Sequence, residues 1–352
     1  MRIYTRTFWS IVLGIALLGV SASAQGRKWQ FAPPQNGGPA ARHQVERGVQ
    51  KLDPKQSGSG YTWLELDPSG QGVGYCYADA HALNNADQVV INWSDPSDCN
   101  IWHASLWDKG KWLPLDYTCS PSCTEPASYL TGITHSGFAF GTYWSMCPDG
   151  PYEPAGGVNV KSRQWSLLPN ILGYPLNQGF SLSDNGVAVG VASNPDSTAF
   201  QHWIWDGSAY TFLTFPDDWD VNTWWAGPLF INNRGQIVGQ YYDTKLKYER
   251  GYLQEGSTIT ILDLPGNPDG GTYVNGINNE GYALLAGSYD AGSPYYPSAS
   301  FVYKQGNFTQ LPAPPFNDMT LWFIFNVNDH GDMIGRWWDS NNQIHTFIAF
   351  RN

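Results

Sequence analysis

The sequence has few positive charges and only one long apolar run, and each shortage excludes a class of protein. Lys and Arg total 19 against 30 Asp and Glu, which gives a net charge of −11. Binding to duplex nucleic acid requires clustered Lys and Arg that displace counterions, so we expect no nucleic-acid partner. A membrane-spanning helix requires about 20 consecutive apolar residues, and no segment after the N-terminal region is that apolar. We therefore also expect no membrane span.

The one apolar run, Phe8–Val20, lies at the N-terminus. It follows Arg2 and Arg6 and ends at Ala22-Ser23-Ala24. A basic start, a short apolar stretch and small residues at the end are typical of a cleaved secretory signal. We predict a signal peptide over residues 1–24 and a secreted protein, extracellular or periplasmic. Residues 25–59 are polar, rich in Pro and Gly and without periodicity, which predicts a flexible linker.

Cysteines are also few. The five are Cys76, Cys99, Cys119, Cys123 and Cys147. Disulfides are the rule in an oxidising compartment, and an odd number leaves one thiol over. We expect Cys99, Cys119, Cys123 and Cys147 to form two disulfides of unassigned connectivity, with Cys76 left unpaired. A zinc site would need a second cysteine pair to match Cys119 and Cys123, and the chain has none.

What the chain does have is a repeated motif of about 13 residues. INNRGQIVGQYYD begins at Ile231, and related versions begin at Leu83, Ile133, Leu182, Ile277 and Val327. The turn position falls at residues 87, 137, 186, 235, 281 and 331, so the intervals are 50, 49, 49, 46 and 50 residues. Six copies at this period predict the blades of a propeller.

Each repeat unit contains four strand-like segments. The motif supplies two strands joined by an NxxG turn, and segments such as Arg250–Gln254 and Thr258–Pro265 supply the other two. Four antiparallel strands make one propeller blade. The sixth unit ends after its third strand, while Tyr61–Asp67 precedes the first unit and resembles a fourth strand. We predict an all-β, six-bladed β-propeller of four-stranded antiparallel blades over residues 60–352, in which this N-terminal strand closes the ring.

The turn residues have a physical role in this arrangement. Asn, Ser or Thr opens each turn, and its side chain accepts hydrogen bonds from the backbone two residues on. Glycine three residues later adopts positive φ without a Cβ clash. Asp87 replaces that glycine in the first copy, and Asp tolerates the left-handed region.

The phrase IN-x-x-G-x-(I/V)-V-G, followed by a His-Ala-Phe-like strand, resembles the bacterial extracellular repeat proteins called the HAF family. The second element is degenerate here, as in His103-Ala104-Ser105 and His345-Thr346-Phe347. The resemblance covers about Tyr61 to the end of the chain. It implies an exported propeller and brings no catalytic residues to transfer.

The longer loops are predicted to lie on the face opposite the NxxG turns, and loops on a rigid scaffold carry function. There, the second strand of most units ends in an aromatic residue beside an acid, and a further patch follows Pro216. The candidate ligand-binding residues are Trp93, Asp95, Trp144, Asp217, Asp220, Trp224, Trp225, Tyr242, Asp243, Trp338 and Asp339. Aromatic rings that stack on sugars and carboxylates that accept hydroxyl hydrogen bonds would bind glycan. Alternatively, the aromatics pack between blades and the acids cap loops.

Enzyme signatures are weak. The propeller region holds only Arg163, Arg234, Arg250, Arg336 and Arg351, too scattered for the arginine cluster of a sialidase, and no GxSxG motif occurs. We predict a monomeric, non-catalytic binding module for glycan or another surface ligand, with no obligatory cofactor. One alternative is a calcium-dependent hydrolase or lactonase with oxygen ligands in the central channel. The other is a protein-interaction scaffold that binds a surface protein.

Overall fold

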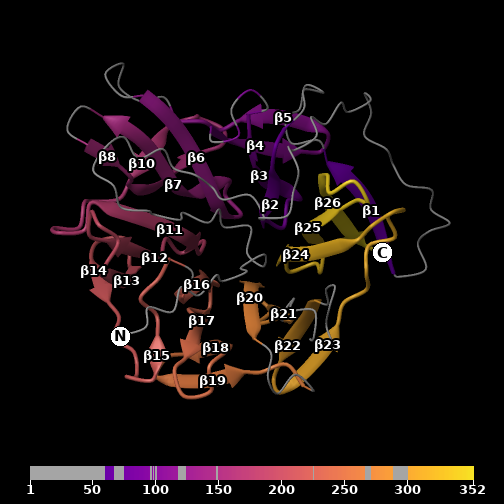
Figure 1. The fold of residues 1–352 in the computed structure, drawn as a ribbon. Coiled ribbons are helices and arrows are strands. Elements are labelled where there is room, and N and C mark those ends of the chain that lie inside the picture. Colours follow the sequence, from indigo (N-terminus) through magenta and orange to yellow (C-terminus); the bar gives the residue numbers. More distant parts are fainter. Residues whose placement is uncertain are drawn as a thin grey trace.

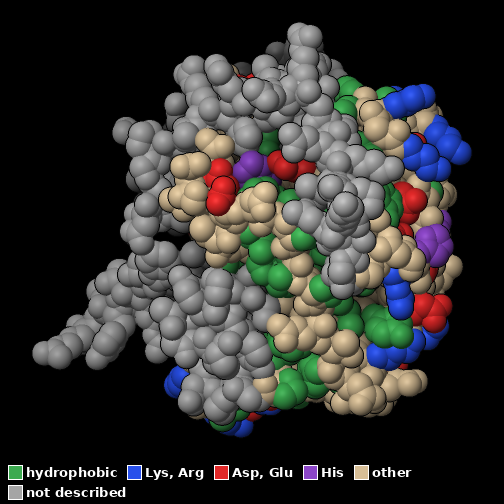
Figure 2. Space-filling view, turned by 90° about the vertical axis from the view of Figure 1, so that its right-hand side faces the viewer, with side chains coloured by type: hydrophobic (Ala, Val, Ile, Leu, Met, Phe, Trp, Pro, Cys, Tyr) green, Lys and Arg blue, Asp and Glu red, His purple; other side chains and the backbone are tan. Residues whose placement is uncertain are grey.

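The chain folds into a six-bladed β-propeller, as predicted. The computed structural model describes residues 60–66, 75–95, 97, 99, 101–117, 124–147, 150–224, 226–265, 271–287 and 300–352. The predicted signal peptide and linker lie outside these residues. The described residues form 26 strands and no helix, and six antiparallel sheets are arranged around a central axis (Figure 1). On the side shown in Figure 2, Lys and Arg lie along the right-hand edge and hydrophobic side chains are visible across the middle.

Each blade begins with its innermost strand. Blade 1 consists of β2 (Ala78–Leu83), β3 (Gln88–Ser94), β4 (Trp102–Asp108) and β5 (Lys111–Pro114). Blade 2 consists of β6 (Thr124–Ile133), β7 (Phe138–Cys147), β9 (Ala155–Asn159) and β10 (Trp165–Leu167), with β8 (Gly150–Tyr152) paired to β7. Blade 3 consists of β11 (Leu176–Leu182), β12 (Ala188–Ser193), β13 (Phe200–Trp205) and β14 (Tyr210–Phe212).

The second half of the ring repeats the pattern. Blade 4 consists of β16 (Gly227–Ile231), β17 (Ile237–Asp243), β18 (Glu249–Glu255) and β19 (Thr258–Leu262), with β15 (Trp219–Asp220) paired to β17. Blade 5 consists of β20 (Thr272–Ile277), β21 (Ala283–Gly287), β22 (Ser300–Lys304) and β23 (Asn307–Gln310). Blade 6 consists of β24 (Leu321–Val327), β25 (Met333–Trp338), β26 (Ile344–Arg351) and β1 (Tyr61–Leu66).

Blade 6 closes the ring with strands from both ends of the propeller. The strand β1 pairs antiparallel with β26, from Tyr61 opposite Arg351 to Leu66 opposite Thr346. The indigo β1 therefore lies beside the yellow β26 in Figure 1. The Asn352 N–H also donates to the Gly60 carbonyl at 2.9 Å. The prediction that an N-terminal strand closes the ring is confirmed.

The first residue of the NxxG turn holds its own turn and links neighbouring blades. The Oδ1 atom of Asn232 accepts the N–H groups of Arg234 and Gln236, each at 3.0 Å. Its Nδ2 donates to the carbonyl of Asn278, the equivalent residue of the next blade, at 2.9 Å. The same interblade bond runs from Asn84, Asn278 and Asn328. At the glycine position, Gly235 has a φ of 73° and Asp87 a φ of 61°, which confirms the predicted left-handed conformation.

The second glycine of the motif is explained by close packing within the blade. A Cβ added to Gly239 would lie 1.9 Å from the Gly227 carbonyl oxygen and 2.6 Å from the Tyr252 hydroxyl. Tyr252 belongs to the third strand and is buried. Only glycine fits at this position, because the Gly227 carbonyl and the Tyr252 ring of β18 occupy the space that a Cβ would need.

A polar residue of the second strand forms a further link to the next blade. Asn92 exchanges two hydrogen bonds of 2.8 Å with the backbone of Leu130. At the equivalent position, Thr142 accepts the Gly179 N–H at 3.2 Å and Gln240 accepts the Val274 N–H at 3.1 Å.

In blade 6 this position is Arg336, which forms a buried ion pair with Asp79 of blade 1. Asp79 is 2% exposed and Arg336 is 8% exposed. The guanidinium lies over the Trp338 ring, 4.5 Å from its centroid. Burial alone would raise the pKa of Asp79, but Arg336 and His81 outweigh it and hold the pKa below its usual range. An ionised pair thus joins the first blade to the last.

The cysteine prediction is wrong in one respect: Cys76 forms a disulfide with Cys99. Cys76 precedes β2 and Cys99 follows β3, and the pairing of Ala78 with Trp93 brings these two ends together. Strand pairing, which the cysteine spacing does not reveal, decides the bond. Cys119 and Cys123 lie outside the described residues, as does the side chain of Cys147.

Candidate functional site

The acids that end the second strands cap the loops that follow them. Asp95 accepts the Ser97 N–H at 2.6 Å. Asp243 accepts the N–H groups of Lys245 and Leu246 at 2.9 Å. Asp339 does the same in blade 6, where it accepts the N–H groups of Asn341 and Gln343 at 2.8 Å. One oxygen of each of these three carboxylates is therefore engaged within its own loop.

The same acids flank a basic side chain of the third strand. In blade 1, His103 Nδ1 lies 2.9 Å from Asp116 Oδ2 and its Nε2 lies 3.8 Å from Asp95 Oδ2. In blade 6, His345 lies between Glu65 and Asp339. In blade 4, Arg250 lies between Asp243 and Asp263. In each of these three blades, a His or Arg side chain lies between two carboxylates. The repeated 13-residue motif does not reveal this feature, because the His or Arg lies outside it.

The group in blade 1 is the most open of the three. The side chains of His103, Asp95 and Asp116 are 26%, 32% and 39% exposed. The hydrogen bond to Asp116 raises the pKa of His103, against the lowering effect of burial. The imidazole therefore carries its positive charge to a higher pH than an ordinary histidine, and both carboxylates stay close to it.

In blades 1 and 6, an aromatic ring near the end of the second strand stacks on the histidine of this group. Trp93 lies on His103 with ring centroids 4.6 Å apart, and its Nε1 donates to Ser105 Oγ at 3.0 Å. Trp337 lies on His345 at 4.1 Å. Trp93 is one of the predicted ligand-binding residues, whereas Trp337 is the neighbour of the predicted Trp338.

A second ring covers the equivalent aromatic residue in three other blades. Trp219 stacks on Tyr241 at 3.7 Å and Phe316 stacks on Trp337 at 4.8 Å. In blade 2, Tyr117 lies 4.1 Å from Tyr143. The covering rings come from the segment before the innermost strand, and Tyr143, Tyr241 and Trp337 are all buried.

Trp93 differs from these residues because it is only half-buried. Among the described residues, His103 is the only aromatic ring that stacks on it. The segment between β1 and β2 carries Tyr75 and Tyr77, but Tyr77 stacks on Trp102 and the buried Tyr75 donates its hydroxyl to the Ile344 carbonyl at 3.0 Å. Among the described residues, no second ring therefore covers Trp93 in the way that one covers its equivalents in blades 2, 4 and 6.

The remaining candidate residues are dispersed. Trp224 is 3% exposed and packs edge-on against Phe200 in the core. Trp338 is buried beneath Arg336. Asp217 and Asp220 are exposed, and Asp220 accepts the Asn222 N–H at 3.1 Å. Trp144 and Tyr242 are half-buried, and Trp225 lies outside the described residues.

A ring of polar side chains at the NxxG face was missed by sequence reasoning. The second turn residue of each blade contributes one member: Asn85, His135, Asp184, Asn233, Asn279 and Asp329. From His135 to Asp329, each backbone N–H donates to the side chain of the next member, at 2.6 to 2.9 Å. The signal was present in the motif, because this position is polar in all six copies.

The polar ring lies at the mouth of the central channel and lines a cavity of about 70 Å³. His135 Nδ1 lies 2.6 Å from Asp184 Oδ2. Burial would raise the pKa of Asp184, but hydrogen bonds from Asn233 and His135 lower it below its usual range. Side-chain oxygens of the polar ring thus accept hydrogen bonds from neighbouring blades. The calcium-dependent hydrolase stays a prediction, and these hydrogen bonds compete with a calcium ion for the oxygens.

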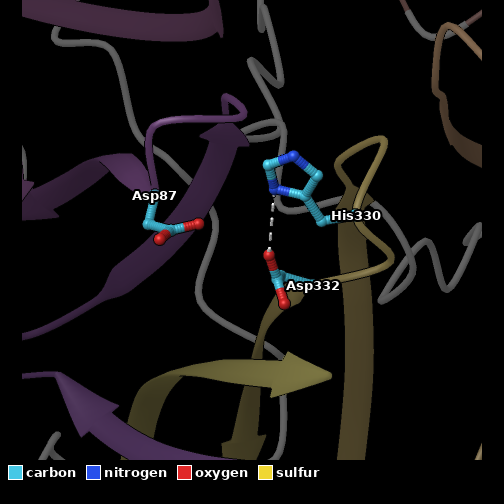
Figure 3. A group of neighbouring side chains, drawn as sticks. All are labelled: Asp87, His330 and Asp332. Atoms are coloured by element: carbon cyan, nitrogen blue, oxygen red, sulfur yellow. Dashed lines mark ion pairs between the residues drawn. The ribbon is translucent and has the colours of Figure 1, made fainter. Parts of the chain in front are cut away.

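Two further titratable features stand apart from Trp93. Glu153, between β8 and β9 of blade 2, is 2% exposed and its Oε1 accepts a hydrogen bond from Gln178 of blade 3 at 2.7 Å. Burial raises the pKa of Glu153 to about 8, so its carboxyl is mostly protonated at neutral pH. At the turns of blades 1 and 6, Asp87, His330 and Asp332 converge, as Figure 3 shows.

Comparisons with known proteins add no functional assignment. No protein-family model matches the chain, and no curated protein matches it, so the HAF resemblance stays a hypothesis. The described part of the chain contains no helix long and apolar enough to cross a membrane.

Solved structures similar to the chain include propellers of several kinds. A fungal lectin from Aleuria aurantia, described as a six-bladed β-propeller with a novel fucose recognition mode, is 9% identical, with a TM-score of 0.42 over 77% of this chain and 90% of the lectin. TolB from Acinetobacter baumannii is 12% identical, with a TM-score of 0.42 over 79% of this chain and 65% of TolB. The Hadza microbial sialidase Hz136 is 10% identical, with a TM-score of 0.44 over 78% of this chain and 65% of the sialidase. The chain thus spans less than two thirds of TolB and the sialidase, and the similarity concerns propeller architecture without assigning an activity.

Proposed function

We propose that this protein is a secreted, non-catalytic binding module that recognises a neutral glycan on the loop face of blade 1, at Trp93. The observation that supports this most directly is the half-buried Trp93 indole. In blades 2, 4 and 6 the equivalent aromatic residue is buried under a second ring, whereas among the described residues of blade 1 only His103 stacks on Trp93. A flat ligand about the size of an aromatic ring would stack on Trp93, in the place that the second ring has in blades 2, 4 and 6.

The polar surroundings of Trp93 favour a sugar over a purely aromatic ligand. Asp95 and Asp116 are partly exposed, and an ionised carboxylate only accepts hydrogen bonds. Hydroxyl groups of a pyranose donate such bonds while its apolar ring face covers the indole. The hydrogen bond from Trp93 to Ser105 and the stack on His103 hold the indole in place before the ligand arrives. Preorganisation of this kind reduces the entropy lost on binding.

The test is isothermal titration calorimetry of the protein with a panel of neutral oligosaccharides. We expect Trp93→Ala to weaken binding at least about tenfold, because a buried aromatic contact contributes about 2 kcal/mol or more at a binding site. Phe212→Ala is the matched control, since Phe212 is 47% exposed on the outer strand of blade 3. Equal thermal stability of the variants would show that each is folded.

Two results would contradict the proposal. Binding that survives Trp93→Ala unchanged would place the ligand elsewhere. Release of shorter saccharides during the titration would show catalysis and favour the hydrolase alternative. A wild-type protein that binds no member of the panel but retains a protein partner would favour the scaffold.

A further inference from the structure

The seam between the first and last blades carries a group of side chains that no other turn reproduces. Asp87 occupies the position that is glycine in the other five turns, with a φ of 61°. His330 and Asp332 belong to the equivalent turn of blade 6. This seam is where the ring closes, so a link here joins residues far apart in sequence.

The three side chains converge on a common space. One ligand atom from each lies within 4.8 Å of the other two, and Figure 3 shows the three side chains directed toward one another. His330 Nδ1 lies 3.9 Å from Asp332 Oδ2, which is too long for a hydrogen bond. The distances leave room for an atom between the donors.

The two carboxylates of this group lie close together in a partly buried position. Asp332 is only 6% exposed and accepts hydrogen bonds from Asn328 Nδ2 at 2.9 Å and from the Arg351 N–H at 2.8 Å, whereas the Oδ1 atom of Asp87 is buried with no hydrogen-bond partner. In the part of the chain that the structure describes, neither residue forms an ion pair with Lys or Arg. A positively charged ion between the two carboxylates would offset their mutual repulsion.

We propose that Asp87, His330 and Asp332 bind a divalent transition-metal ion of the zinc type, which clamps blade 6 to blade 1. One imidazole nitrogen and two carboxylate oxygens form a three-ligand set that suits Zn²⁺, with water in the fourth position. Calcium prefers six to eight oxygen ligands, so the imidazole disfavours it. His330 is 61% exposed on its side chain, which gives the ion a path of entry. The site is separate from Trp93 and independent of glycan binding.

The experiment measures Zn²⁺ binding to EDTA-treated protein by calorimetry, and Tm with Zn²⁺, Ca²⁺ or Mg²⁺. We expect one Zn²⁺ per chain and a rise in Tm of about 4 °C at a hundredfold excess over Kd, with no comparable rise for the other ions. Both Asp87→Gly and His330→Ala weaken Zn²⁺ binding more than about tenfold.

Asp87→Gly is informative because it restores the glycine of the other five turns. Without metal, this variant is expected to be at least as stable as the parent protein, since glycine adopts the left-handed region without strain. Glu280→Ala is the matched control: it removes an exposed carboxylate at the turn position that His330 occupies in blade 6, and it should bind Zn²⁺ normally.

Three outcomes would overturn the proposal. These are absence of Zn²⁺ binding in the parent protein, undiminished binding in Asp87→Gly, or equal loss in Glu280→Ala. If the parent binds no Zn²⁺ and Asp87→Gly removes a pH dependence of stability, the two carboxylates share a proton in place of a metal ion.

Discussion

Replacement of Arg336 by Leu tests how the propeller ring is held closed. Leu keeps an apolar side chain against Trp338 but leaves the Asp79 carboxylate buried without its partner. Removal of one member of a buried ion pair costs about 3–5 kcal/mol. With an unfolding entropy of about 2.1 cal/mol/K per residue over about 290 residues, this cost lowers Tm by about 5–8 °C.

The assay is urea unfolding followed by tryptophan fluorescence, with two companion variants. In Thr142→Val the equivalent link of blade 2 is lost, and because that hydrogen bond is neutral the expected cost is about 1 kcal/mol. In the double variant Asp79→Leu/Arg336→Leu no unpaired charge is left, so most of the lost stability should return. The reasoning is refuted if Arg336→Leu costs no more than Thr142→Val, or if the double variant is no more stable than the single one.

The pH dependence of the ion pair has a definite sign. The pKa of Asp79 is lowered in the folded protein, so the pair stabilises the fold above the ordinary aspartate pKa and loses this effect as pH falls through the lowered value. The stability difference between the parent protein and Arg336→Leu should therefore shrink below about pH 4. A difference that persists unchanged at that pH would contradict the electrostatic explanation.

Four other features give shorter predictions. Reduction of the Cys76–Cys99 disulfide, whose cysteines are 23 residues apart, should cost about 2–4 kcal/mol in thermal unfolding with and without reductant. Because Asp116 raises the pKa of His103, the pair stabilises the fold most below about pH 6.5, and this stabilisation declines as pH rises through the raised pKa. Asp116→Asn should flatten this decline in the free energy of unfolding and lower the pKa of His103 in an NMR titration. Glu153→Gln should stabilise the protein at pH 7 by up to about 3 kcal/mol in urea unfolding, because the folded state of the parent holds a proton there that the unfolded state releases. Deletion of residues 1–67 removes β1 and should cause concentration-dependent association on gel filtration, because the edge of β26 is left unpaired.

Much of the fold could be predicted from the sequence because its determinants are local. The Asn–Gly spacing of the turn specifies a left-handed residue and an Asx hydrogen bond within five residues, and both occur at Asn232 and Gly235. The closing strand was found because the last unit is one strand short. The Cys76–Cys99 bond was missed because it depends on the register of β2 and β3, which a list of cysteine positions does not contain.

The candidate site was harder to predict for a related reason. Trp93, Tyr241 and Trp337 follow the same motif, and only the packing of Trp219 and Phe316 distinguishes covered rings from the half-buried one. That cover comes from segments outside the motif. Likewise, the polar ring at the NxxG face consists of Asn, Asp and His at one repeat position. Its members share a hydrogen-bonding role but not a residue type.

The pairing of β1 with β26 also sets an order of events when the chain is made. β1 is synthesised before any blade, and its partner is synthesised only after the other five blades are complete. Until then β1 has no native neighbour in the sheet, because the other three strands of blade 6 are not complete. A nascent or truncated chain that lacks its last residues therefore cannot assemble the finished ring. Closure makes the finished ring depend on the synthesis of β26, and chains that stop before this strand keep an open strand edge.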